Sequence, residues 1–139
     1  MDPLQALEIK AFVPARDFAL AQRFYRSLGF EIPWHDDHLA YVRHGSTSFL
    51  LQHFDEPAFC ASFQMHLLVS DADAWYARAR VVAAEFGVAV GEPADRPWAM
   101  RDFTLLDPSG VLWRIAHHLP KAPQGSEPQL DGRTGESAP

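Results

Sequence analysis

The two halves of the chain present the same order of sequence patterns, and this duplication restricts the fold more than any other feature of the sequence. FVPARDFALAQRFYRSLGFEI (residues 12–32) and LLVSDADAWYARARVVAAEFGVAV (residues 67–90) can be laid over one another. Each segment has an extended apolar start, an Asp suited to cap a helix, apolar residues at helical spacing, and a Gly where the helix should end. Few residues are identical between the segments, so the repeat is one of pattern, and we expect two modules of the same build.

The first module is expected to contain one helix and four strands. The alternation in LEIKAFV predicts a strand over residues 7–13, which Pro14 should end. A helix over residues 18–28 follows, with Asp17 as its N-cap. Strands are then predicted over residues 30–34, 39–43 and 47–54, and residues 55–61 are expected to form a connector.

The second module is expected to repeat this order and to end in a hairpin. We predict a strand over residues 63–69, a helix from Asp71 to about Phe86, a short strand over residues 88–90 and a loop over residues 92–99. The closing segment, RDFTLLDPSGVLWRI (residues 101–115), consists of two extended stretches around a turn. In that turn Asp107 can bond the backbone two residues on, Pro108 fixes φ, and Gly110 tolerates a positive φ.

The expected fold class is α+β, with two βαβββ modules. Each module should have one sheet face covered by its helix and one open face, and the two modules together should form an eight-stranded, curved mixed sheet around a concave groove. We place one domain at residues 1–119, with modules at about 5–56 and 62–119. Residues 120–139 are rich in Pro, Gly, Ser and Gln and are expected to be a disordered tail.

Charge and composition exclude several classes of function. The net charge of -6 disfavours a nucleic-acid partner, which requires clustered Lys and Arg. No apolar run approaches the roughly 20 residues of a membrane span, and the N-terminus has no signal-peptide pattern, so we expect no membrane partner and a cytoplasmic location. The single cysteine, Cys60, has no adjacent activating cation and is expected to be a small buried residue.

Three stretches, ARDFALAQRFYRSLGFE, VSDADAWYARA and MRDFTLLDPSGVLWRI, resemble the vicinal oxygen chelate superfamily, which includes glyoxalase I, bleomycin-resistance proteins and extradiol dioxygenases. They occur in the family's order and cover roughly residues 7–118. The resemblance implies paired βαβββ modules, and often a homodimer whose grooves each hold a ligand.

Enzymes of this superfamily hold a divalent metal with four side chains, and the resemblance assigns those positions here to Lys10, Gln52 (within one residue), Gln64 and Arg114. Protonated Lys and Arg have no lone pair for a metal. We therefore predict no metal, no other cofactor and no catalytic residue at this site. His66 lies on the same strand face as Gln64, where it is either a displaced metal ligand or a hydrogen-bonded groove residue.

The remaining prediction is a ligand groove. We expect six side chains to point into it: Lys10, Phe12, Gln52, Gln64, His66 and Arg114. Trp34, Trp98, Met100 and Arg101 are placed at its rim, because they lie in or beside loops and exposed aromatic rings suit flat ligands. Two alternatives stay open: the tryptophans cap the core edge or a dimer interface, and Lys10 pairs with Glu8 instead of with an anionic ligand.

These residues favour a binding protein over an enzyme. The leading hypothesis is a metal-independent small-molecule binding protein of the bleomycin-resistance kind, which sequesters an antibiotic or another aromatic ligand. One alternative is a metal-dependent lyase, isomerase or dioxygenase of the same superfamily. Another is a dimeric protein whose groove is vestigial.

Overall fold

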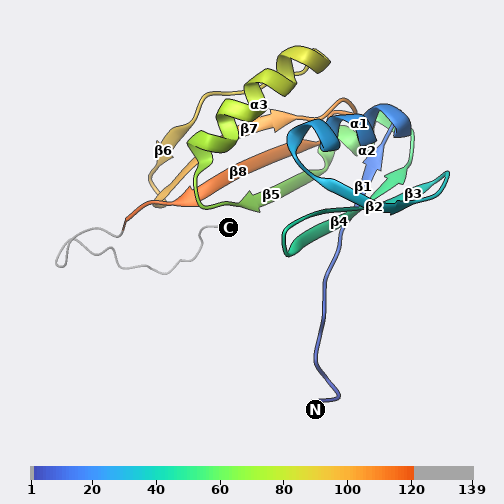
Figure 1. The fold of residues 1–139 in the computed structure, drawn as a ribbon. Helices are drawn as coiled ribbons and strands as arrows, with labels where there is room; N and C mark the ends of the chain where they lie inside the picture. Colours follow the sequence, from blue (N-terminus) through green and yellow to red (C-terminus); the bar gives the residue numbers. More distant parts are fainter. Residues whose placement is uncertain (1, 121–139) are drawn as a thin grey trace.

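Each half of the chain folds into a four-stranded sheet with a helix packed against one face (Figure 1). The computed structural model describes residues 2–120. The first half contains β1 (Phe12–Ala15), α1 (Phe18–Leu28), β2 (Glu31–His35), β3 (Leu39–His44) and β4 (Thr47–His53). A short helix, α2 (Pro57–Ser62), leads to the second half, which contains β5 (Gln64–Leu68), α3 (Ala72–Phe86), β6 (Ala94–Arg96), β7 (Met100–Leu106) and β8 (Leu112–His118).

The strand orders of the two sheets are equivalent, β1-β4-β3-β2 and β5-β8-β7-β6. In each sheet the first strand pairs parallel to the last, and the other pairs are antiparallel. The α+β class and the two βαβββ modules are therefore confirmed. The eight strands form two sheets rather than one continuous sheet, since no ladder joins the sheets within residues 2–120.

Core side chains and the closing turn join the two modules. The ring of Trp113 on β8 lies 5.3 Å from that of Phe49 on β4 and 5.7 Å from that of Tyr25 on α1. The Tyr25 hydroxyl donates to Oδ2 of Asp107 at 2.5 Å and accepts from Trp113 Nε1 at 2.9 Å. Because Asp107 also accepts from the backbone N–H groups of Ser109 and Val111, one carboxylate both closes the hairpin turn and attaches it to the first module.

Both long helices begin and end at the predicted residues. Asp17 accepts from the backbone N–H of Leu20, and Asp71 accepts from that of Ala74, each at 3.1 Å. Gly29 and Gly87 follow the helices with φ of 116° and 68°, a conformation that other residues rarely adopt. Of the helices in the described part of the chain, none has the length and apolar character that crossing a lipid bilayer requires.

The first predicted strand is displaced toward the C-terminus. Residues 7–11 alternate as a strand should, but β1 begins only at Phe12, where pairing with β4 begins. β1 also includes Pro14, because an edge strand tolerates a residue without an N–H. The apolar side chains before it, Leu4, Leu7 and Ile9, are 88%, 86% and 95% exposed.

Two local predictions in the connections are wrong, and a third is incomplete. The connector over residues 55–61 contains α2, which begins with Pro57, a residue suited to the first turn of a helix. Residues 88–90 make only an isolated bridge, Val90 with Leu105, while the predicted loop over 92–99 contains β6. β6 forms because pairing with β7 outweighs the local loop signals of two prolines. The predicted tail lies outside the described residues except for Pro120, and the domain boundary stays a prediction.

Candidate functional site

A cavity of about 290 Å³ lies where the two modules meet, and we call it the seam cavity. It is lined by nine residues from both modules: Phe30, Thr47, Ser48, Phe49, Met65, His66, Leu67, Leu68 and Trp113. Phe49 and Trp113 are buried, and Ser48 and His66 add polar groups to the lining. An apolar cavity with a few polar groups is the usual form of a small-molecule site.

Strand alternation decides which side chains lie on the open face of each sheet, opposite its helix. On β5, Gln64, His66 and Leu68 are exposed, while Met65 and Leu67 pack toward the core. His66 lies opposite Arg114 in the β5–β8 pair. Burial lowers the pKa of His66, and the positive charges of Arg114 and His118 act in the same direction against the opposing charge of Asp102. His66 is therefore neutral at neutral pH.

Glu8, in the segment before β1, has three polar partners. Lys10 Nζ lies 2.6 Å from its carboxylate, the Ser48 hydroxyl donates to it at 2.7 Å, and the Tyr41 hydroxyl donates at 3.1 Å. These hydrogen bonds, that of Lys10 first, lower the pKa of Glu8 to about 2. The ion pair between Lys10 and Glu8, one of the two alternatives for Lys10, is thus present, and it leaves this cluster without net charge.

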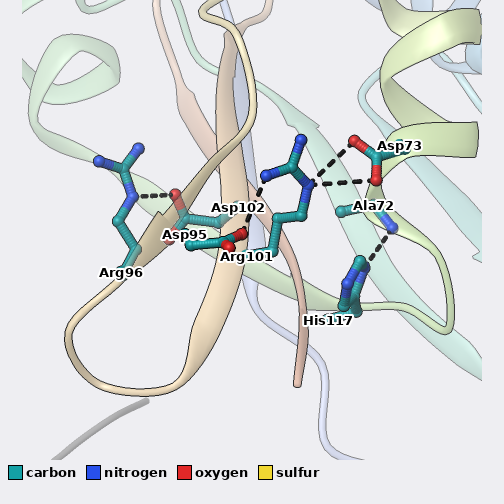
Figure 2. A network of polar contacts seen from close by, with 7 residues as sticks. All are labelled: Ala72, Asp73, Asp95, Arg96, Arg101, Asp102 and His117. Atoms are coloured by element: carbon teal, nitrogen blue, oxygen red, sulfur yellow. Dashed lines mark hydrogen bonds and ion pairs between the residues drawn. The ribbon is translucent and has the colours of Figure 1, made fainter. Parts of the chain in front are cut away.

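On the second sheet, two guanidinium groups surround one buried carboxylate. Asp102 on β7 is 1% exposed, and Arg96 Nε donates to it at 2.8 Å (Figure 2). Arg114 NH1 lies 3.4 Å from both of its carboxylate oxygens. The side chains of Arg96 and Arg114 remain 32% and 35% exposed, so both cations reach the surface above the buried acid. We call these three residues the Arg96–Asp102–Arg114 cluster.

The strand register tests whether the metal positions of the superfamily can hold a metal here. Phe12 pairs with Leu50, as His66 pairs with Arg114 in the other module. The position equivalent to Arg114 is therefore Leu50, two residues before the predicted Gln52. Two cations, an aliphatic side chain and the amide of Gln64 do not fit a divalent ion. Within the described residues, no group of three or more His, Cys, Asp or Glu is arranged to hold one.

Several of the predicted ligand-binding residues lie on the open face of the first sheet or in a turn. Phe12 and Trp34 are 51% and 50% exposed, and Trp34 belongs to β2, opposite Tyr41. Gln52 is exposed and lies between Pro14 and Leu39 in the sheet. Trp98, in the turn after β6, is 48% exposed. Of the ten predicted residues, only His66 lines the seam cavity itself.

Two rim predictions are wrong in their placement. Met100 is 2% exposed, because β7 begins there and pairs it with His118. Arg101 follows on the opposite face of β7, toward α3, where Nε contacts Asp73 at 3.0 Å and NH1 contacts Asp95 at 2.9 Å (Figure 2). The turn ends at Ala99, as the predicted loop does, so both residues belong to β7 and their side chains follow the alternation of that strand.

Arg96 and Asp102 were not among the predicted site residues. A signal for Asp102 exists in the sequence, since the polar alternation of RDFTLL puts Asp102 on the same strand face as Thr104. The turn at residues 107–110 also sets the register that puts Thr104 opposite Arg114 and Asp102 opposite Ala116. The seam cavity had no such signal, because its lining combines residues 47–49 with residues 65–68.

A larger cleft of about 610 Å³ lies between α1 and α3, on the helix side of the molecule. Its lining includes Leu28, Trp75, Arg78 and the 64% exposed Val81. Arg78 donates to the backbone oxygen of Ser27 at 3.3 Å and so links the two helices. The cleft contains none of the predicted ligand-binding residues, so we take the seam cavity as the candidate site.

Comparison with known proteins agrees with this architecture. The profile of the Glyoxalase/Bleomycin resistance protein/Dioxygenase superfamily matches residues 8–115. A bleomycin-binding protein solved in complex with bleomycin has a TM-score of 0.69 and 22% identity, over 80% of this chain and 98% of its own. TnmS3, an antibiotic binding protein from Streptomyces sp. CB03234, has a TM-score of 0.65 and 26% identity, over 84% and 99%. A lactoylglutathione lyase from Agrobacterium tumefaciens has a TM-score of 0.62 and 18% identity, over 84% and 96%. The comparison with curated proteins found no match.

Proposed function

This chain belongs to the Glyoxalase/Bleomycin resistance protein/Dioxygenase superfamily, and we propose that it is a metal-independent binding protein that sequesters a small molecule. The ligand places an apolar or aromatic part in the seam cavity. The observation that carries this proposal is the cavity of about 290 Å³ with Phe30, Phe49 and Trp113 in its lining. That volume is at the lower end of the range for ligand sites, which suits one ring system of a larger molecule.

The donor set at the metal positions supports binding rather than metal-assisted chemistry. Lys10 and Arg114 occupy two of the four positions, and neither can coordinate a cation. Arg114 is also engaged with Asp102. The bleomycin-binding protein and TnmS3 are named as binding proteins, which supports the same role for a chain of this fold.

We further propose that the protein acts as a homodimer in the cytoplasm. Leu4, Leu7 and Ile9 expose most of their apolar surface in a segment that runs away from the first sheet (Figure 1). Exposed apolar residues of this kind indicate a protein–protein contact. The single buried thiol, Cys60, is compatible with a reducing compartment.

The test of the binding function uses two variants that each add a ring to a different recess. Thr47→Phe narrows the seam cavity at an exposed lining position, and Val81→Phe does the same in the cleft between α1 and α3. We expect a panel of bleomycin and aromatic antibiotics, titrated by calorimetry and Trp fluorescence, to include a ligand of the natural sequence. Thr47→Phe should weaken that ligand at least tenfold and Val81→Phe should leave it unchanged.

Two results would overturn the proposal. The first is no binding across the panel, or a loss of binding confined to Val81→Phe, which would remove the seam cavity as the site. The second concerns metal independence. Stoichiometric Zn, Ni, Mn or Fe in protein purified without chelator would show that the chain holds a metal despite its donor set, and would favour the lyase, isomerase or dioxygenase alternative.

A further inference from the structure

We infer that the Arg96–Asp102–Arg114 cluster recognises one anionic group of the bound ligand, a carboxylate or a similar oxyanion. This inference rests on the proposed binding function and adds the charge of the ligand. It also separates this chain from a receptor for cationic ligands, which would place acidic side chains beside the cavity.

The first argument is the charge balance of the cluster. Two guanidinium groups and one carboxylate leave one positive charge in excess. The neighbouring His66 does not add a charge at neutral pH, because its pKa is lowered. A single carboxylate bound at the surface would therefore neutralise the cluster.

The second argument is the hydrogen-bonding capacity that the two arginines keep. Arg96 uses Nε for Asp102, and Figure 2 shows its two terminal nitrogens pointing away from that carboxylate. Arg114 uses only NH1, at the long distance of 3.4 Å. Among residues 2–120, the side-chain hydrogen bonds described for the two arginines all go to Asp102. Planar guanidinium groups with free N–H pairs are suited to bidentate binding of a carboxylate.

The third argument is the buried acid, which positions the cations in advance. Asp102 is 1% exposed and contacts both arginines from below, so it orders two long side chains before any ligand arrives. Ordering in the free protein reduces the entropy lost on binding. Two like charges on one sheet face would otherwise repel each other, and the acid between them allows both to remain near the surface.

The fourth argument is position. His66 lines the seam cavity and is the cross-strand neighbour of Arg114. A ligand with its ring in the cavity would therefore carry its anionic group past His66 to Arg114.

A third arginine of the second sheet, Arg101, differs from the two arginines of the cluster in its surroundings. Arg101 lies between two carboxylates on the helix side of the same sheet, where Asp73 and Asp95 already oppose its single charge (Figure 2). Arg101 is as exposed as the two cluster arginines, with 30% of its side chain accessible. Arg101→Gln therefore changes the net charge as Arg114→Gln does but removes no anion site, which makes it the matched control.

The experiment compares two probes of the same shape, 2-naphthoate and its neutral amide, 2-naphthamide. We expect the natural sequence to bind naphthoate at least tenfold more tightly than naphthamide, measured by calorimetry. Arg114→Gln and Arg96→Gln should each remove about tenfold of naphthoate affinity, as expected for a charge-assisted hydrogen bond at a partly exposed site, and leave naphthamide unchanged. Arg114→Lys should retain most of the preference, and Arg101→Gln should retain all of it.

The outcomes separate this inference from the binding function. If naphthamide binds as tightly as naphthoate and Thr47→Phe weakens both, the cavity function stands and the anion site is overturned. If naphthoate binding depends on Arg114 but not on Thr47→Phe, the anion site stands and the cavity function is overturned. An equal loss of naphthoate in Arg101→Gln and Arg114→Gln would overturn the anion site, because it would show a response to net charge alone. If neither naphthoate nor naphthamide binds, both the anion site and the cavity function are overturned.

Discussion

Replacing Tyr25 by Phe should destabilise the fold strongly, although it removes a single oxygen atom. Tyr25 is fully buried, and its hydroxyl is at once the donor to Asp107 Oδ2 and the acceptor for the indole N–H of Trp113. A hydrogen bond to a charged group contributes about 1.5–3 kcal/mol, and an unsatisfied buried donor costs about 1–3 kcal/mol. The two effects overlap at one atom, so we expect the free energy of unfolding to fall by about 3 kcal/mol.

The measurement is urea unfolding followed by far-UV circular dichroism. The urea concentration at the midpoint should fall, while the slope of the unfolding free energy against urea concentration stays constant. Tyr41→Phe is the control, because its hydroxyl bonds the exposed Glu8 at 3.1 Å and its loss should cost less than about 1 kcal/mol. In a Trp113→Phe background the cost of Tyr25→Phe should drop by about 1–2 kcal/mol, since the N–H that it leaves unpaired is gone. Equal costs for Tyr25→Phe and Tyr41→Phe would refute the view that this hydroxyl joins the modules.

Three further predictions concern the first module, the helix cap and assembly. The pKa of Glu8 is about 2 in the fold against an ordinary 4.5, so its stabilising effect is complete above pH 4.5 and is lost as the pH falls from 4.5 to about 2; Glu8→Gln should flatten the acid unfolding curve in that window. Asp71→Ala should reduce the free energy of unfolding by about 1 kcal/mol, and Asp71→Ser should restore most of it, in the same urea assay. A variant with both Leu7→Glu and Ile9→Glu should be monomeric in light scattering while the natural sequence is dimeric, and a monomeric natural sequence would contradict the proposed dimer.

The parts of the fold that could be predicted are those whose signals are local. Asp17 and Asp71 cap helices through bonds to backbone groups three residues away, and Gly29 and Gly87 end them through their own φ angles. The closing turn is equally local, because Asp107 accepts from the N–H groups of Ser109 and Val111 as the sequence suggests. In each of these patterns the groups that hydrogen-bond to one another lie within a few residues in the sequence.

The parts that could not be predicted depend on partners distant in the sequence. Residues 7–11 alternate like a strand, but only pairing with β4 makes a strand, and that pairing begins at Phe12. Residues 94–96 carry loop signals, yet β7 beside them supplies a strand to pair with. Arg101 was expected at a rim, and α3 instead supplies Asp73 across the helix side of the sheet. In each case a long-range partner decides between two locally acceptable structures.

Each module contains an ion pair at one of the positions that the resemblance assigns to a metal, and the two ion pairs can be compared. One of the two positions that the resemblance assigns to a metal in the first module holds Lys10, paired with Glu8, and a different one of the two in the second module holds Arg114, paired with Asp102. A side-chain cation thus stands near an acid in both modules. The two pairs differ in what surrounds the acid. Glu8 is 37% exposed, and Lys10, Ser48 and Tyr41 all hydrogen-bond to its carboxylate. Asp102 is 1% exposed and is shared with a second cation, Arg96.

Only the second pair therefore retains positive charge for a ligand, and it is the pair whose neighbour, His66, lines the seam cavity. A ligand in that cavity would meet a neutral ion pair, Lys10 with Glu8, on the first module and the cationic Arg96–Asp102–Arg114 cluster on the second. This difference in charge between the two clusters predicts the orientation of the ligand, with its anionic end toward β8.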